Sequence, residues 1–129
     1  MKTNSLMLGI YLVVCACNKG REVDTDPTQP TITLTLPTNN EVYTSGDSIK
    51  IKGTVTDNSL HELRLTITNN ANGNILYHLE ISVHELLSYD FDQGWKSIAT
   101  AGTDATVRVE AEDHGNHTVE KEVTVHLNP

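Results

Sequence analysis

The 129-residue sequence has few cysteines, few prolines and few positive charges, and each scarcity excludes a class of protein. Its 2 cysteines cannot hold together a disulfide-rich miniprotein. Its 8 glycines and 4 prolines exclude collagen and low-complexity chains. With 9 Lys+Arg against 17 Asp+Glu, the formal net charge is −8, which disfavours a nucleic-acid binder that relies on a basic face. The length suits about one domain, so a multidomain enzyme is not expected.

The sequence motifs of common enzyme classes are also missing. The chain contains no Gly-x-Ser-x-Gly elbow, no His-Glu-x-x-His and no glycine-rich phosphate loop. Carboxylates are plentiful, but they alternate with apolar residues, as on the solvated face of a strand. We therefore expect a protein that is not an enzyme and whose function resides in a binding surface or site.

The N-terminal residues predict a lipoprotein signal peptide of the bacterial type. Lys2 precedes an apolar run at residues 6–14, which is too short to cross a membrane and fits the hydrophobic region of a signal peptide. The sequence Val14-Cys15-Ala16-Cys17 then resembles a lipobox, with an aliphatic residue three positions before Cys17 and a small residue directly before it. An ordinary secretory signal and an N-terminal hydrophobic strand are the alternatives.

The lipobox resemblance implies how and where the protein is anchored. A diacylglycerol is placed on Cys17, residues 1–16 are cleaved off and the new terminus is N-acylated, so that several acyl chains such as palmitate hold the mature protein on a membrane. Asn18 follows Cys17, where Asp would signal retention in the inner membrane. The expected location is the outer membrane, on either its periplasmic or its cell-surface face.

Residues 17–30 are expected to form a flexible tether between the lipid and the domain. Beyond the lipidated cysteine, the only apolar side chains in this segment are Val23, Pro27 and Pro30. Such a segment cannot bury an apolar face, and its prolines and polar residues favour an extended, solvated chain. An extended tether of this length reaches about 40 Å, which lifts the domain away from the bilayer.

From Thr31 the sequence alternates between apolar and polar residues, which is the signal of strands that bury one face. The pattern predicts strands near residues 32–36, 49–55, 63–67, 75–83, 87–91, 107–111 and 123–127. Turn-forming clusters separate these runs, and Asn72-Gly73 predicts a two-residue hairpin turn. No stretch has sustained helical periodicity, and residues 97–104 are expected to be a loop. About seven strands predict an antiparallel, immunoglobulin-like β-sandwich over residues 31–129.

Two motifs in this region resemble those of known bacterial domains. Residues 53–58, Gly-Thr-Val-Thr-Asp-Asn, resemble the second strand of bacterial Ig-like repeats. Residues 107–113, followed by Gly115-Asn116, resemble their sixth strand and the turn into the seventh. Together with the lipobox, residues 31–127 resemble the small Ig-like lipoproteins of Bacteroidota. The resemblance implies a fold and a lipid anchor, and it supplies no catalytic residue.

Four histidines are the candidate metal ligands. If successive strands run in opposite directions, the connections after the second, fourth and sixth expected strands lie at one end of the sandwich. These connections carry His61, His84, His114 and His117, and we expect the four side chains to converge there. Imidazole groups with nearby carboxylates suit a divalent cation such as Zn²⁺.

Oxygen-bearing residues at the same end leave a second cation open. Asp57, Asn58, Asp113 and Asn116 offer the oxygen ligands that Ca²⁺ prefers, and the carboxylate of Glu85 belongs to the same end. Neither ligand set has a recognised spacing. Ordinary polar loop residues, with no bound ion, are the third interpretation.

An interaction or structural role in the cell envelope is the leading hypothesis for the domain. Its partner would be an envelope protein or a glycan, and nucleic acid is not expected. Trp95, the single tryptophan, is expected to pack in the core or at its rim rather than to form a sugar-stacking platform. His78 and His126 are expected in mid-strand and toward the opposite end, away from the candidate ligands.

Overall fold

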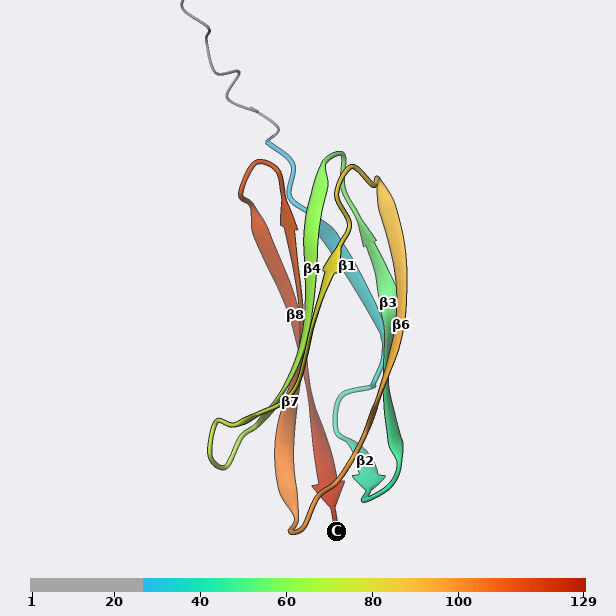
Figure 1. Ribbon diagram of the computed structural model, residues 1–129, viewed down its shortest axis with the longest axis vertical. Helices are drawn as coiled ribbons and strands as arrows, with labels where there is room; N and C mark the ends of the chain where they lie inside the picture. The colour runs from blue at the N-terminus through green and yellow to red at the C-terminus, as the bar shows by residue number, and fades with distance from the viewer. Residues whose placement is uncertain (1–26) are drawn as a thin grey trace, which may run out of the picture.

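The computed structural model describes residues 27–129, which form two packed β-sheets and contain no helix (Figure 1). The predictions for the signal peptide, for Cys17 and for most of the tether lie outside the described residues. Within residues 27–129, no helix is present that could cross a membrane. The strands are β1 (Thr31–Leu36), β2 (Glu41–Thr44), β3 (Ser48–Thr56), β4 (Leu60–Asn69), β5 (Ile75–Ser82), β6 (Ser88–Lys96), β7 (Thr103–Asp113) and β8 (Thr118–Asn128).

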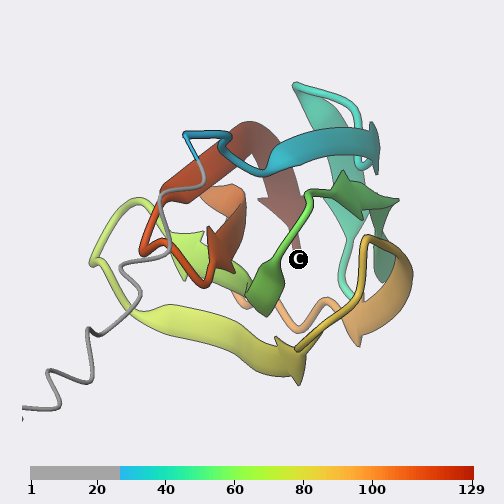
Figure 2. The same ribbon diagram turned by 90° about the horizontal axis from the view of Figure 1, so that it is seen from above.

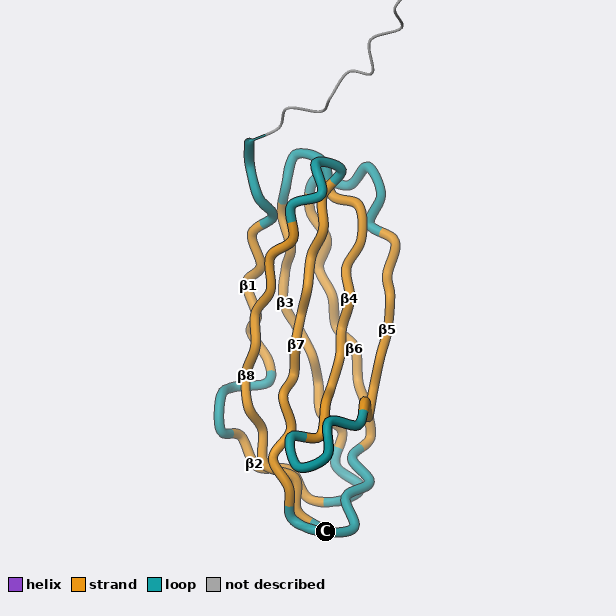
Figure 3. Tube along the Cα trace, turned by 90° about the vertical axis from the view of Figure 1, so that its left-hand side faces the viewer, coloured by secondary structure: helices purple, strands orange, loops and turns teal. Residues whose placement is uncertain are grey.

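The strands form a sandwich of two unequal layers. A 3-stranded sheet has the order β1-β3-β6, and a 5-stranded sheet has the order β2-β8-β7-β4-β5. Figure 2 shows the two layers from above, and Figure 3 shows β8, β7, β4 and β5 side by side. The predicted all-β sandwich is confirmed, with 8 strands in place of about seven.

The additional strand is β2, and its pairing corrects the expectation of a wholly antiparallel sandwich. β2 pairs in parallel with β8, with Tyr43 opposite Leu127. The chain crosses from the first sheet to the second between β1 and β2 without reversing its direction. A hydrogen bond fixes this connection to β8, because Asn40 N–H donates to the carbonyl of Thr124 at 2.7 Å. Sequence alternation misses β2 because its 4 residues place only one partly buried apolar side chain against the core.

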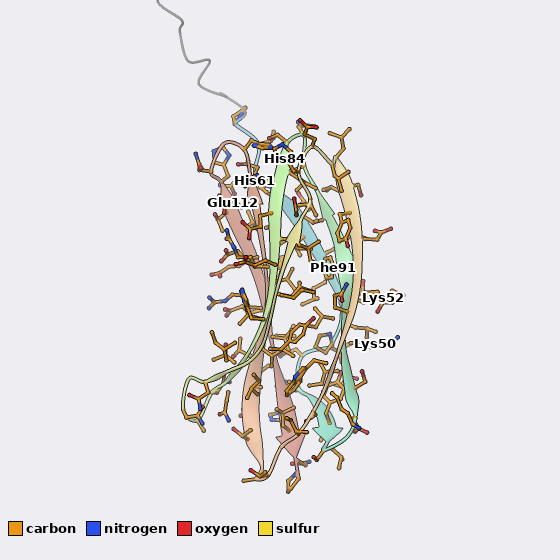
Figure 4. All side chains as sticks on the ribbon, in the orientation of Figure 1. Lys50, Lys52, His61, His84, Phe91 and Glu112 are labelled. Atoms are coloured by element: carbon orange, nitrogen blue, oxygen red, sulfur yellow. The ribbon has the colours of Figure 1, made fainter. Side chains whose placement is uncertain are left out.

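The inward faces of β3, β4 and β7 supply most of the core. Every second residue of β3 from Ile49 to Val55 is buried, and β7 buries every second residue from Ala105 to Asp113. Phe91 of β6 points into the space between the sheets (Figure 4). The buried apolar residues are Ile32, Ile49, Ile51, Val55, Leu60, Leu63, Leu65, Ile67, Val83, Phe91, Ala105, Val107, Val109, Ala111, Val125 and Leu127.

Gly53 allows β1 to approach β3 and the core closely. A Cβ atom at this position would lie 2.1 Å from the carbonyl oxygen of Thr33 and 2.7 Å from Cζ of Phe91. Both separations are far below van der Waals contact, so only glycine fits between the β1 backbone and the aromatic ring. The motif that resembles a bacterial Ig-like strand therefore begins with a residue required by packing.

The β4–β5 connection differs from its prediction. It spans residues 70–74, because β4 ends at Asn69 and β5 begins at Ile75. Gly73 has a positive φ of 74° and its N–H donates to the carbonyl of Asn69 at 2.8 Å. The predicted two-residue turn is wrong, since side-chain oxygens of Asn69 and Asn72 accept hydrogen bonds from the backbone and stabilise a longer loop.

Three further boundaries also move. Leu87 is 67% exposed, not buried on a strand face, because it lies in the connection before β6 begins at Ser88. The loop expected over residues 97–104 is shorter, since β7 already begins at Thr103. β6 extends to Lys96, so Trp95 lies on a strand.

Candidate metal centre

One end of the sandwich collects three histidines from three different parts of the chain. His61 is the second residue of β4, His84 lies in the connection after β5, and His114 directly follows β7. Figure 4 shows His61 and His84 together at this end, near the first described residues of the chain. We call His61, His84 and His114 the histidine cluster.

The three rings of the histidine cluster contact one another. The ring centroids of His84 and His114 are 4.5 Å apart, those of His61 and His114 are 4.8 Å apart, and those of His61 and His84 are 5.7 Å apart. Each residue offers one ligand atom, and all of these atoms lie within 4.8 Å of one another. The structure therefore brings together three of the four predicted ligands, while metal binding itself stays a prediction.

These separations come close to the geometry of a zinc centre. Nδ1 of His84 lies 3.5 Å from Nδ1 of His61. Two nitrogens bound to one zinc ion at about 2.0–2.1 Å and a tetrahedral angle lie roughly 3.4 Å apart. No two ligands of that ion are more than about 4.2 Å apart. A spread of up to 4.8 Å thus requires a small rotation of at least one ring toward the ion, which the exposed His61 and His84 side chains allow.

Backbone pairing positions His84 beside His61. The ladder between β4 and β5 continues past the end of β5, because Val83 N–H donates to the carbonyl of His61 at 3.2 Å. Glu85 N–H donates to the carbonyl of Leu60, also at 3.2 Å. Glu85 has a positive φ of 64°, which turns the chain away toward β6 immediately after His84. His84 is therefore held between two backbone hydrogen bonds to the start of β4.

A buried carboxylate shapes the turn that carries His114. The side chain of Asp113 is fully buried, and its Oδ1 accepts the backbone N–H of His117 at 2.8 Å. Its Oδ2 lies 2.8 Å from Nδ1 of His117. The N–H of His114 donates to the carbonyl of Ser59 at 2.9 Å, which ties the turn to the β3–β4 connection. His114 is thus presented by a turn with few free backbone groups.

His117 departs from the predicted ligand set. It lies at the same end, but Nδ1 of its ring is directed to Asp113 and it does not belong to the group of potential ligands. The attraction between a buried carboxylate and an imidazole N–H outweighs the open position beside the other histidines. The four histidines thus lie at the predicted end of the sandwich, and His117 is outside the group of three potential ligands.

The aspartate oxygens considered as Ca²⁺ ligands have hydrogen-bond partners within the protein. Oδ2 of Asp57 accepts the backbone N–H of Ser59 at 2.9 Å, within its own turn. Both side-chain oxygens of Asp113 are directed to His117. These oxygens stabilise two separate turns, and the group of potential metal ligands among residues 27–129 contains none of them.

Three glutamates gather around Arg64 on the outer face of the 5-stranded sheet, and one of them, Glu62, directly follows His61. Arg64 donates to Glu62, Glu110 and Glu112 at 2.8, 2.5 and 2.9 Å. The carboxylates of Glu110 and Glu112, which accept these hydrogen bonds, raise the pKa of Arg64 above its usual range. Three carboxylates against one guanidinium leave this group negatively charged, which favours the approach of a cation. Figure 4 shows Glu112 on the same side of the molecule as His61.

The two remaining histidines lie in other surroundings. Nδ1 of His126 lies 2.5 Å from Oδ1 of Asp104. The two residues are opposite each other in the β7–β8 pairing, near the C-terminal end of β8. His78 contacts Thr66 and Glu80 on the outer face of β5. Neither belongs to the histidine cluster. His78 lies in mid-strand and His126 toward the opposite end, as predicted.

A groove at the opposite end is the feature that sequence reasoning missed. Trp95 is partly buried against the core, and it lines a groove of about 540 Å³ together with Ile75 and Ile98. Ile75 is 64% exposed and Ile98 is 74% exposed. Alternation assigned Ile75 to a buried face, and the groove depends on the loop at residues 97–102, which supplies much of its lining.

Comparison with known proteins supports the fold. No protein-family model and no curated protein matches the sequence. The chain is similar to an engineered protein of known crystal structure, with a TM-score of 0.56 and 14% identity over 80% of this chain and 21% of that one. It is also similar to the fibronectin(III)-like modules of CbhA from Clostridium thermocellum, with a TM-score of 0.50 and 20% identity over 78% of this chain and 47% of that one.

The protein covers less than half of each of these longer chains, and at such identities the likeness shows the fold alone. Fibronectin type III modules share the sandwich architecture of immunoglobulin domains. The predicted immunoglobulin-like fold is therefore confirmed.

Proposed function

We propose that this protein is a lipid-anchored, immunoglobulin-like module of the bacterial cell envelope that binds a divalent transition-metal ion through His61, His84 and His114. The observation that carries the proposal is the histidine cluster itself, whose ligand atoms lie within 4.8 Å of one another. Imidazole nitrogen suits Zn²⁺ and Cu²⁺, and a set of three histidines is an established zinc-binding arrangement.

The surroundings of the histidine cluster favour a bound cation over an incidental contact of rings. The three histidines come from different parts of the chain, His61 from β4 and the other two from connections, and hydrogen-bonded backbone fixes His84 and His114. The neighbouring group of Arg64 with three carboxylates carries net negative charge. A metal ion would be held by three exposed or partly exposed rings that already contact one another.

The anchor proposal rests on the lipobox at Val14-Cys15-Ala16-Cys17. Its consequence for orientation comes from the fold, because the described chain begins at the same end as the histidine cluster (Figure 1). With Cys17 acylated, the tether would join the domain at its metal-binding end. That end would therefore be the one nearer to the anchor point, and the groove beside Trp95 would lie at the end farther from it.

Calorimetry with Zn²⁺ and Cu²⁺ tests the proposed metal binding. The protein is the mature chain from residue 17, with Cys17→Ser so that a free thiolate does not bind metal. We expect one ion per chain, and loss of binding when His61, His84 and His114 are all replaced by Ala. A variant with His78→Ala and His126→Ala is the matched control and should bind as the parent does. Equal binding by both variants would place the metal elsewhere.

Interaction with an envelope glycan or protein through the groove is a second candidate function. The specific observation is the pair of strongly exposed isoleucines, Ile75 and Ile98, beside Trp95. A glycan array probed with the parent protein and with Ile98→Asp tests the glycan case. Capture by the parent and not by the variant would support it, and no capture by either would remove it.

A further inference from the structure

The histidine cluster supplies three ligands and leaves the remaining positions around a metal ion to something else. Among residues 27–129, the group of potential ligands contains His61, His84 and His114 and no fourth side chain. Nearby carboxylates are engaged elsewhere, since Asp57 accepts the N–H of Ser59 and Asp113 is directed to His117.

Glu85 is a carboxylate beside the cluster, and its position suits an outer partner better than a ligand. Nδ1 of His84 faces Nδ1 of His61 at 3.5 Å, while Nε2 of His84 lies 3.7 Å from Oε1 of Glu85. If Nδ1 of His84 binds the ion, Nε2 carries the proton and points toward Glu85. Metal-bound histidines commonly donate their other ring N–H to a carboxylate in this way.

Solvent reaches the cluster directly. His61 and His84 are both exposed, and both lie at the end of the sandwich rather than between the sheets. A tetrahedral ion held by these nitrogens would therefore have one side open to water. Structural zinc sites are closed by four protein ligands, whereas three-ligand sites keep a position for water or another small ligand.

We propose that the histidine cluster holds its metal ion with one exchangeable coordination position, occupied by water at rest and by a small anion when one is supplied. The proposal rests on the metal binding proposed above. In this proposal the bound metal exchanges its small ligands with the solvent, and it does not stabilise the fold. The core is built without the cluster, so the metal-free domain should remain folded.

Cobalt(II) spectroscopy with azide as the probe tests the exchangeable position. The mature Cys17→Ser protein is loaded with one equivalent of Co²⁺, and the visible absorption of the metal is followed during an azide titration. We expect a saturable spectral change with a stoichiometry of one azide per cobalt. The variant with all three cluster histidines replaced by Ala is the control for azide binding to free cobalt.

Two further variants identify any protein ligand that fills the fourth position. Glu85→Ala and a variant with Glu22, Asp24 and Asp26 of the tether replaced by Ala are titrated in the same way. The proposal expects both to bind azide as the parent does. An azide response seen only after one of these replacements would show that a carboxylate of the protein closes the site, and would overturn it.

The two proposals fail in distinguishable ways. No cobalt binding by the parent, or equal binding by the three-alanine variant, would contradict the metal-binding function. Cobalt bound through the cluster with a spectrum that azide never alters would contradict only the exchangeable position. Circular dichroism of the metal-free parent should match the metal-loaded spectrum, and unfolding on metal removal would show a structural centre.

Discussion

His61 and His84 are 23 positions apart in the chain, yet their Nδ1 atoms lie 3.5 Å from each other at the end of the sandwich. The β4–β5 ladder produces this contact, because it continues from Glu62 opposite Ser82 to the hydrogen bond between Val83 N–H and the carbonyl of His61. His114 joins them from β7, the other neighbour of β4. Three adjacent strands of one sheet thus deliver the three rings.

Single replacement of a cluster histidine should weaken metal binding without weakening the fold. His61→Ala, His84→Ala and His114→Ala should each lower the affinity for Zn²⁺ by more than the ~10–100-fold typical of changes outside the ligand set. The free energy of unfolding should change by less than about 0.5 kcal/mol for the exposed His61 and His84, as for other surface positions. Calorimetry and urea unfolding measure the two quantities.

Acidification should also release the metal, because protons compete with the ion for the imidazole nitrogens. Zinc affinity measured at pH 7 and at pH 5 should be lower at pH 5. Equal affinity at both values would argue that carboxylates and not histidines hold the ion.

Removal of the buried carboxylate at position 113 should affect the fold and the cluster together. Asp113→Ala leaves the backbone N–H of His117 without its side-chain acceptor and loosens the turn that carries His114. The free energy of unfolding should fall by about 1–3 kcal/mol, and zinc affinity should fall as well. Asp104→Ala, which breaks an exposed pair with His126, is the matched control and should cost at most about 1 kcal/mol. If both variants lost the same unfolding free energy and the same zinc affinity, Asp113 would not position the turn that carries His114.

Gly53→Ala should destabilise the packing of β1 on β3. The added methyl group would meet the Thr33 carbonyl and the ring of Phe91 at impossible distances, so β1 or the ring must move. Overpacking of this kind costs at least about 1–3 kcal/mol in the free energy of unfolding. Gly94→Ala in β6 is the comparison, since its added Cβ would meet only the Ser48 hydroxyl at 3.2 Å. Chemical denaturation of both variants should give a clearly lower midpoint for Gly53→Ala.

Cys17→Ala should release the protein from membranes. The lipobox places the acyl chains on Cys17, so this variant lacks the residue that carries the proposed lipid anchor. Membrane fractionation and labelling with palmitate should show both membrane association and label lost in this variant. Cys15→Ala, which leaves Ala16-Cys17 intact, should keep both. A Cys17→Ala protein that still sediments with membranes would contradict the anchor.

The sequence predicts the fold well where one face of a strand is buried. Alternation locates β3, β4 and β7 because their inward positions are apolar almost without exception. It misses β2, whose stability comes from backbone pairing with a strand far away in sequence. It also places Leu87 inside, because a run of alternating residues does not show where the preceding connection ends.

The candidate site could be predicted in part for the same reason. The direction of successive strands places His61, His84 and His114 at one end, and the unexpected β2 precedes β3 and so leaves those directions unchanged. The contact between the His117 ring and Asp113 could not be predicted, because alternation does not encode contacts between side chains. The groove beside Trp95 depends on the path of the loop at residues 97–102, which carries no regular pattern.

Anomalous diffraction from crystals of the mature Cys17→Ser protein grown with one equivalent of Zn²⁺ tests the central claim most directly. The account predicts one peak at the zinc absorption edge, about 2.0–2.1 Å from one ring nitrogen each of His61, His84 and His114. Density for a non-protein ligand should occupy the remaining position. A peak beside His126 and Asp104, or no peak at the histidine cluster in crystals that contain zinc, would contradict the account.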